Sequence, residues 1–201
     1  MIKLPASFYE RDDVVLLAGE LLGKIMVTEW DGVLTSGRIV ETEAYAGLRD
    51  KASHAYRGKT PRTAVMFETG GTAYVYLCYG LHQMFNIVTA KKGVPHAVLI
   101  RAVAPQEGIA KMLERTGKKG ADASLTRGPG NVGKAFGMHR SQTGTSLQSD
   151  LLYIADDGYQ VPPDVVGISA RIGVAYAGDD ALLPYRFYLK SSPYVSGRPI
   201  Q

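Results

Sequence analysis

Residues 24–45 read KIMVTEWDGVLTSGRIVETEAY, and this stretch decides the fold. A first run ends at Trp30, an alternating run continues to Tyr45, and between them stands Asp31-Gly32, a dipeptide typical of tight β-hairpin turns. We therefore expect two strands joined by this turn, in a sheet that is at least partly antiparallel.

Similar patterns predict the rest of the sheet. Residues 72–79 and 81–90 are rich in β-branched, aromatic and apolar side chains and flank Gly80, which indicates a second hairpin. Three more strands are expected, at residues 94–104, 151–155 and 185–190.

Three helices are expected around these strands. The acidic pair at residues 12–13 precedes an apolar run that Gly23 stops, which indicates a short N-capped helix lying as a lid on the sheet. A proline opens the predicted helix over residues 105–115, and a further short helix is expected at 132–138.

The remaining long segment, residues 46–71, is rich in Gly, Arg, Lys, Thr and Pro and has little periodicity. A connection of this length in a compact domain is usually functional. Because no internal repeat or interdomain linker is present, we expect residues 1–201 to form one mixed α+β domain.

The composition limits the chemistry. With 45% hydrophobic residues, the chain can close a core without disulfides or structural metal. Its one cysteine, Cys78, cannot form an internal disulfide, and four scattered histidines give no zinc-ligand spacing. We expect no metal and no cofactor.

Charge and hydropathy indicate the compartment and the partner. The longest apolar runs are far shorter than the roughly 18 residues of a membrane span, and the N-terminus lacks the pattern of a secretory signal. We expect a cytoplasmic protein, nucleoid-associated if bacterial, with no membrane partner. The net charge of +4 favours a polyanionic partner only mildly.

A charged residue interrupts the most apolar strand. Arg101 stands within the run AVLIRAVA at residues 97–104, where a guanidinium would be buried. Burial of this charge is costly unless the side chain reaches solvent or pairs with an acid. The arginine therefore needs a partner. A purely structural ion pair or an edge-strand arginine is the alternative to a functional pair.

Acidic and aromatic residues share one face of the strand that ends at Tyr45. The two-residue period places Glu41, Glu43 and Tyr45 together, so that a carboxylate stands beside an aromatic ring. This arrangement suits an acid or base next to a stacking surface. Taken alone, paired glutamates on a strand more often form a solvated face.

Aromatic residues also cluster in the second hairpin. Tyr74 and Tyr76 fall on one face, and Tyr79 lies next to the Gly80 turn, where an exposed ring suits wedging or stacking in nucleic acid. Packing within the hairpin is the alternative. His54, on the long connection, has no second histidine at metal spacing, and a satisfied loop histidine is its simpler interpretation.

Residues 128–133 read GPGNVG and match the pattern G-x-G-x-x-G. No strand precedes them, proline occupies the second position and no βαβ alternation surrounds them, so a dinucleotide site is not expected. A glycine-rich helix entry followed by Lys134 suits phosphate binding. A structural turn explains it equally well.

Taken together, these segments resemble the alkyladenine (3-methyladenine) DNA glycosylase family over nearly the whole chain. The order and spacing of the motifs carry the resemblance; Tyr194, where vertebrate members have tryptophan, and a shortened stretch at 117–127 depart from it. The matching motifs are RIVETEAY (38–45), His54, TPR (60–62), GTAYVY (71–76), Tyr79-Gly80, Asn86, LIRA (99–102), Gly128-Pro129, Lys134, ARIGV (170–174), RFY (186–188) and SPYVS (192–196).

The resemblance implies a fold and a set of roles. The expected fold is a curved, largely antiparallel β-sheet with a protruding β-hairpin and flanking helices. Glu43 would activate a water that Arg101 and the backbone carbonyl of Ile172 help to hold. Tyr45 would stack on one face of the extruded base, and His54 with Tyr76 on the other. Tyr79 would fill the vacated space in the duplex, and Asn86 would exclude the guanine 2-amino group. The phosphate contact by Lys134 is expected from the glycine-rich helix entry alone.

The implied activity is that of a monofunctional base-excision-repair glycosylase acting on double-stranded DNA as a monomer. It would hydrolyse the N-glycosidic bond of flipped-out alkylated or deaminated purines: 3-methyladenine, 7-methylguanine, hypoxanthine and ethenoadenine. No lysine lies in the matched pocket motifs, so a water nucleophile and an intact abasic product are expected. The alternatives are a non-catalytic nucleic-acid-binding module and, more remotely, a nucleotide-dependent oxidoreductase.

Overall fold

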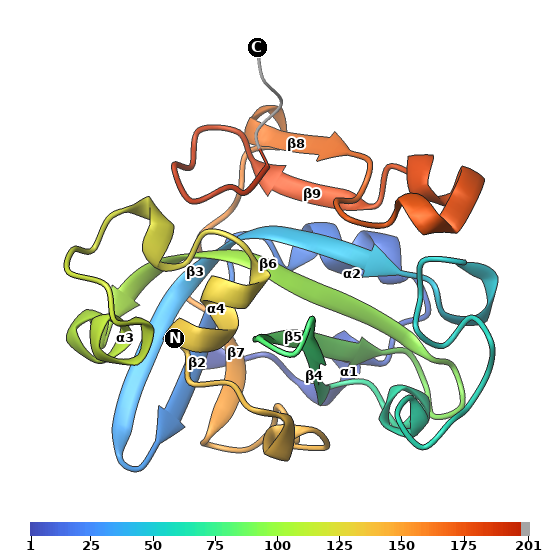
Figure 1. Cartoon of the computed structure of the whole chain (residues 1–201), viewed down its shortest axis with the longest axis horizontal. Coiled ribbons are helices and arrows are strands. Elements are labelled where there is room, and N and C mark those ends of the chain that lie inside the picture. Colours follow the sequence, from blue (N-terminus) through green and yellow to red (C-terminus); the bar gives the residue numbers. More distant parts are fainter. Residues whose placement is uncertain (198–201) are drawn as a thin grey trace.

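The hairpin predicted at residues 24–45 forms the centre of the sheet in the computed structural model, which describes residues 1–197 (Figure 1). β2 (Ile25–Trp30) pairs with β3 (Val33–Tyr45) in antiparallel register from Ile25 opposite Arg38 to Trp30 opposite Val33. Both turn residues, Asp31 and Gly32, have positive φ, as the predicted turn requires.

The sheet is antiparallel throughout, which confirms the predicted fold class. Its main path runs in the order β1, β7, β2, β3, β6, β5, β4. The remaining strands of this path are β1 (Ile2–Lys3), β7 (Leu152–Asp156), β6 (His96–Glu107), β5 (His82–Thr89) and β4 (Thr72–Cys78).

β3 changes its neighbour along its length, and this change places the glutamates. On one edge it pairs with β2 up to Arg38 and then with β9 (Arg186–Leu189) from Glu41 to Glu43, while β6 follows its other edge. The β3–β6 register shifts on either side of Glu41. β9 also pairs with β8 (Val166–Ser169), and Figure 1 shows these two strands side by side next to β3.

Helices flank the sheet as predicted, but their first and last residues differ from the predicted ones. α2 (Val14–Glu20) begins at an N-cap, where the carboxylate of Asp13 accepts a hydrogen bond of 2.9 Å from the amide of Leu16. The other helices are α1 (Ala6–Tyr9), α3 (Ile109–Thr116), α4 (Pro129–Ala135), η1 (Gly47–Arg49), η2 (Ala64–Phe67), η3 (Ala123–Leu125), η4 (Arg140–Gln142), η5 (Pro163–Val165) and η6 (Ala175–Leu182).

The prediction that Pro105 opens a helix is wrong. β6 continues to Glu107, and α3 begins only after Gly108, which has φ of 71°. Because β5 pairs with β6 no further than Leu99, Pro105 lies where that edge of β6 has no β5 neighbour, and an open edge tolerates a residue without an N–H. Gly37 lies opposite, where a Cβ would come within 3.1 Å of the Pro105 Cα.

The glycine-rich segment at residues 128–133 builds a helix against a strand. α4 begins at Pro129, three residues earlier than predicted, and ends at Ala135. Proline is well tolerated in the first turn of a helix. A Cβ on Gly133 would lie 1.9 Å from the backbone oxygen of Gln83, so only glycine lets α4 approach β5 this closely. Packing therefore accounts for this glycine of the motif.

The core lies between the sheet and these helices. Its main cluster joins β2, β3, β5 and β6 with side chains of α1, α2, α3 and α4, and its largest fully buried members include Tyr9, Met26, Phe85, Ile100 and Phe136. No helix within residues 1–197 is long and apolar enough to cross a membrane.

Candidate active site

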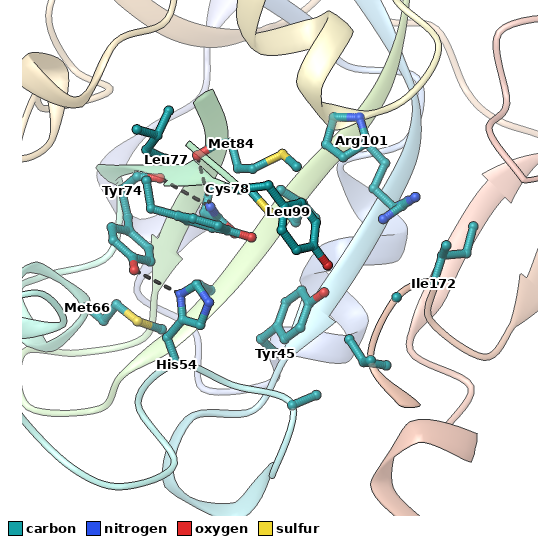
Figure 2. A pocket seen from close by; sticks show the side chains of 18 of the residues that line it. Tyr45, His54, Met66, Tyr74, Leu77, Cys78, Met84, Leu99, Arg101 and Ile172 are labelled. Carbon is teal, nitrogen blue, oxygen red and sulfur yellow. Dashed lines mark hydrogen bonds between the residues drawn. The ribbon is translucent and has the colours of Figure 1, made fainter. Parts of the chain in front are cut away.

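A cavity of about 450 Å³ opens beside the β4–β5 hairpin, between the long connection at 46–71 and the segment preceding η6. Figure 2 shows side chains from β3, β4, β5 and β6 around it. Seven of the residues to which the sequence analysis gave a role in the site line it: Tyr45, His54, Tyr76, Tyr79, Asn86, Arg101 and Ile172.

Glu43 lies behind this cavity on β3 and has no solvent-exposed surface. Its Oε1 atom accepts a hydrogen bond of 2.7 Å from the backbone amide of Ile172. Its Oε2 atom accepts from the phenol of Tyr45 at 2.8 Å and from Nη1 of Arg101 at 3.2 Å. The solvated-face interpretation of the glutamates is therefore wrong, because Glu41 is fully buried too.

Arg101 has the acidic partners that its burial demands. It is 6% exposed, and its Nε atom donates to Oε1 of Glu41 at 3.0 Å while Nη1 donates to Glu43. Burial opposes its charge, but the charges of Glu43 and Glu41 outweigh that cost and raise the pKa of Arg101 above its ordinary value. The predicted pair is thus a buried arginine between two carboxylates.

A second arginine and a serine complete this charge cluster, and both were missed as site residues. Nε of Arg186 donates to Oε1 of Glu41 at 2.7 Å, and its Nη2 donates to the backbone oxygen of Ser196 at 2.6 Å. A weaker signal was present in the sequence, because Arg186 directly precedes the apolar and aromatic residues of β9, whereas Arg101 interrupts an apolar run in β6.

Tyr45 is held from behind by a third buried arginine. The guanidinium of Arg171 lies 4.9 Å from the centre of the Tyr45 ring and makes a two-pronged ion pair with Asp50. Burial, reinforced by the charge of Glu43, raises the pKa of Tyr45 well above its ordinary value. The phenol therefore stays protonated and donates to Glu43.

One wall of the cavity is formed by His54, Tyr74 and Tyr76. Nδ1 of His54 lies 2.9 Å from the Tyr74 hydroxyl, and the His54 and Tyr76 rings meet edge to face with centres 4.5 Å apart. Burial, assisted by the charge of Arg62, lowers the pKa of His54 to about 4. The imidazole is thus neutral near pH 7. Figure 2 shows His54 and Tyr45 at the same cavity.

Asn86 belongs to this cavity and also to the hairpin behind it. Its side chain is nearly buried, and its amide nitrogen donates to the backbone oxygens of Tyr74 at 3.2 Å and Met84 at 3.3 Å. These bonds fix the amide against β4 and β5. They satisfy local backbone groups and also hold Asn86 at the cavity wall.

Tyr79 is 91% exposed at the tip of the β4–β5 hairpin, so the alternative that it packs within the hairpin is wrong. Tyr79 and Gly80 both have positive φ, and the amide of Leu81 donates to the Cys78 oxygen at 3.0 Å to close the turn. Tyr74, by contrast, is buried and packs in the hairpin.

Lys134 and the carbonyl of Ile172 are placed differently from the other predicted residues. Lys134 does not line the cavity; its ammonium donates to the Thr116 oxygen at the end of α3. At Ile172 the backbone amide, not predicted to take part, contacts Glu43. Within residues 1–197, no group of three or more His, Cys, Asp or Glu side chains is arranged to hold a metal ion.

The antiparallel fold, the buried glutamate beside a ring-lined cavity and the exposed hairpin tyrosine are the features that a resemblance to DNA glycosylases implies. The chain belongs to the methylpurine-DNA glycosylase family, whose family model matches residues 7–193. It is therefore a monofunctional DNA glycosylase that acts on alkylated bases. The resemblance found in the sequence is confirmed, and the non-catalytic alternative is wrong.

Relatives similar to this chain carry the name "Putative 3-methyladenine DNA glycosylase". The relative from Desulfitobacterium hafniense is 43% identical over 98% of this chain and 99% of its own length. The relative from Myxococcus xanthus is 45% identical over 98% of this chain and 94% of its own length. The relative from Chlamydia felis is 45% identical over 92% of this chain and 95% of its own length.

Proposed function

We propose that this chain hydrolyses the N-glycosidic bond of single damaged purines in double-stranded DNA, with a water molecule that Glu43 activates. The observation that carries the proposal is the buried carboxylate of Glu43, tied to Arg101 and to two groups at the cavity wall. The proposed substrates are 3-methyladenine, 7-methylguanine, hypoxanthine and ethenoadenine.

The cavity suits a purine that has left the duplex. An enzyme that acts on a paired base must extrude it, and lesions that weaken pairing lower the cost of doing so. The extruded base would stack on Tyr45, with His54 and Tyr76 on its other face. Tyr79, almost fully exposed, would fill the space the base leaves.

Hydrogen-bond capacity supports a water beside Glu43. A carboxylate offers about four lone-pair sites, and Glu43 uses three of them on Ile172, Tyr45 and Arg101. One site remains for a water proton. Of the five N–H donors of Arg101, three have protein acceptors, so two are available to hold that water, together with the proposed carbonyl of Ile172.

The bond changes follow from this arrangement. As the bond from C1′ to the base breaks, the sugar gains oxocarbenium character, which the negative charge of Glu43 stabilises. The water oxygen bonds to C1′, and its proton passes to Glu43. The electron pair of the broken bond leaves with the base. Methylated bases that are already cationic need no protonation, whereas hypoxanthine must gain a proton on departure.

Two further parts of the proposal concern the product and the assembly. None of the described residues that line the cavity is a lysine, so we propose no Schiff base and an abasic product with both strands intact. We also propose that residues 1–201 act as one catalytic domain and as a monomer. Lys134 remains a proposed phosphate contact.

The test is release of free base from a duplex carrying one hypoxanthine or one 7-methylguanine. We expect free base, and strand scission only after alkali. Glu43→Gln keeps the shape but removes the base and the charge, so it should lose excision by orders of magnitude while still binding the duplex. Exposed Glu107→Gln is the matched control. Near-normal excision by Glu43→Gln would refute the role of the carboxylate, and scission without alkali would refute the water mechanism.

A further inference from the structure

The C-terminal turn, residues 192–197, reaches into the charge cluster behind the cavity. Its residue Ser196 is 7% exposed and makes four polar contacts there. The Ser196 amide donates to Oε2 of Glu41 at 2.7 Å, and its oxygen accepts from Nη2 of Arg186. Its hydroxyl donates to Oε1 of Glu41 at 2.9 Å and accepts from Nη2 of Arg101 at 3.1 Å. The hydroxyl therefore bridges Arg101 and the glutamate that Arg101 also contacts.

The same turn touches the second group that holds Glu43. Gly197 has φ of 52°, and a Cβ built on it would lie 2.6 Å from the Cδ1 atom of Ile172. Thus the turn packs closely against the Ile172 side chain, while the Ile172 amide donates to Glu43. Adjacent residues of one turn thus bond the arginine and lie against the side chain of the isoleucine that hold the catalytic carboxylate.

We propose that Ser196 is a positioning residue and that the 192–197 turn is a clasp fixing Arg101 and Ile172 against Glu43. This inference rests on the function proposed above and deepens it. The clasp touches neither the cavity nor a bound base: Ser196 and Gly197 are not among the residues that line the cavity. It should therefore affect the rate of excision and not the capture of the damaged base.

The physical reason lies in the geometry of Arg101. Nε is held by Glu41 and Nη1 by Glu43, and the Ser196 hydroxyl supplies the third anchor, on Nη2. A planar guanidinium held at all three nitrogens has one orientation. Loss of the third anchor lets the group tilt, and small misplacements of groups around a reacting atom slow a reaction by up to about 100-fold.

Ser196→Ala isolates this anchor. The substitution removes the hydroxyl alone and leaves the amide bond to Glu41 and the carbonyl bond from Arg186, so the turn keeps two of its attachments. The matched control is Ser169→Ala. Ser169 also offers a hydroxyl to the cluster, accepting from Nη1 of Arg186 at 3.0 Å, but it has no bond to Arg101.

The experiment measures single-turnover release of hypoxanthine at increasing enzyme concentration, which separates the maximal rate from the half-saturating concentration. For Ser196→Ala we expect the maximal rate to fall about 10- to 100-fold with the half-saturating concentration unchanged. Ser169→Ala should match the wild type in both. Ser196→Thr, which keeps the hydroxyl, should restore most of the rate.

A second variant covers the case in which Ser196→Ala does not fold. Gly197→Ala keeps every polar atom of Ser196 but places a Cβ at a φ of 52°, which residues other than glycine rarely adopt, so the turn must distort and the maximal rate should also fall. Equal rates for Ser196→Ala and Ser169→Ala, or a weakened half-saturation alone, would overturn the clasp, as would a wild-type maximal rate in Gly197→Ala. A wild type that releases no base would overturn the proposed function as well.

Discussion

The phenol of Tyr45 donates a hydrogen bond of 2.8 Å to Oε2 of Glu43, the oxygen that also accepts from Arg101. The ring proposed to stack on the base is thus bonded to the carboxylate proposed to activate water. Because the raised pKa of Tyr45 keeps its phenol protonated, this bond persists across the neutral and mildly alkaline range. The stacking surface and the catalytic group form one unit.

Tyr45→Phe should separate the two roles, because it keeps the ring and removes the bond to Glu43. A hydrogen bond to a charged group contributes about 1.5–3 kcal/mol, so we expect the single-turnover rate to fall roughly 10- to 150-fold with little loss of lesion binding. The control is Tyr185→Phe, whose ring also lies near Arg171, at 5.2 Å. Lesion binding that weakens as much as the rate would argue against the shared bond.

Tyr79→Ser should weaken capture of the extruded state. One aromatic ring stacked on a base contributes about 1–3 kcal/mol, which corresponds to roughly 5- to 150-fold in affinity for lesion-containing duplex. Binding is measured by titration of a labelled hypoxanthine duplex. Tyr56→Ser replaces an exposed tyrosine of the long connection and serves as the control. Should both variants bind alike, Tyr79 has no role in the duplex.

The central strands could be predicted from sequence because their signals are local. The Asp31-Gly32 turn and the alternation on either side of it specify the β2–β3 hairpin without reference to the rest of the chain. Pro105 misled the prediction because proline suits both a helix start and a strand edge without a neighbour. Only the end of β5 pairing at Leu99 decides between them, and that end depends on tertiary structure.

The site, like the fold, could be predicted from the sequence only in part. The anomaly of Arg101 in an apolar strand predicted an acidic partner, and strand periodicity placed Glu41 and Glu43 on one face. Periodicity could not reveal that this face is buried, because its partners come from distant segments: Arg186 and Ser196 bond Glu41, and the Ile172 amide bonds Glu43. The role of Ser196 was equally out of reach, since 95 residues separate it from Arg101 and no local pattern links them.

His54 should make the free energy of unfolding depend on pH. Its pKa is about 4 in the folded chain against an ordinary value of 6.5, so between these values the unfolded chain binds a proton that the folded chain does not. Stability should therefore decrease as pH falls from 6.5 towards 4. The decrease is followed by thermal unfolding, and His54→Gln should lessen it.

The cause of the His54 shift can be tested by NMR titration of its ring protons. Burial is the larger cause and the Arg62 charge the smaller, so Arg62→Ala should raise the pKa of His54 without returning it to 6.5. Arg57→Ala, an exposed arginine on the same connection, is the control. A midpoint near 6.5 in the wild type would show that the imidazole is not held neutral by the pocket.

Asn86 is the residue proposed to distinguish purines by their 2-amino group. Its amide nitrogen is held by the backbone oxygens of Tyr74 and Met84, so the side chain cannot readily turn away from a base in the cavity. Guanine derivatives carry the 2-amino group and would meet a mild clash there, which slows excision of 7-methylguanine without preventing it, whereas hypoxanthine and adenine-type bases lack this group.

Asn86→Ser shortens this wall and should favour 7-methylguanine over hypoxanthine by about 1–2 kcal/mol, roughly 5- to 30-fold in the ratio of their single-turnover rates. The ratio is the proper measure, because the substitution also removes the amide donor from two backbone oxygens and so destabilises the enzyme. That loss of stability affects the rates on both substrates equally and cancels in their ratio. Asn131→Ser is the matched control: Asn131 likewise donates to a backbone oxygen, that of Arg127, but does not line the cavity. If the ratio for Asn86→Ser equals that of the control, Asn86 serves the hairpin alone and another group must exclude guanine.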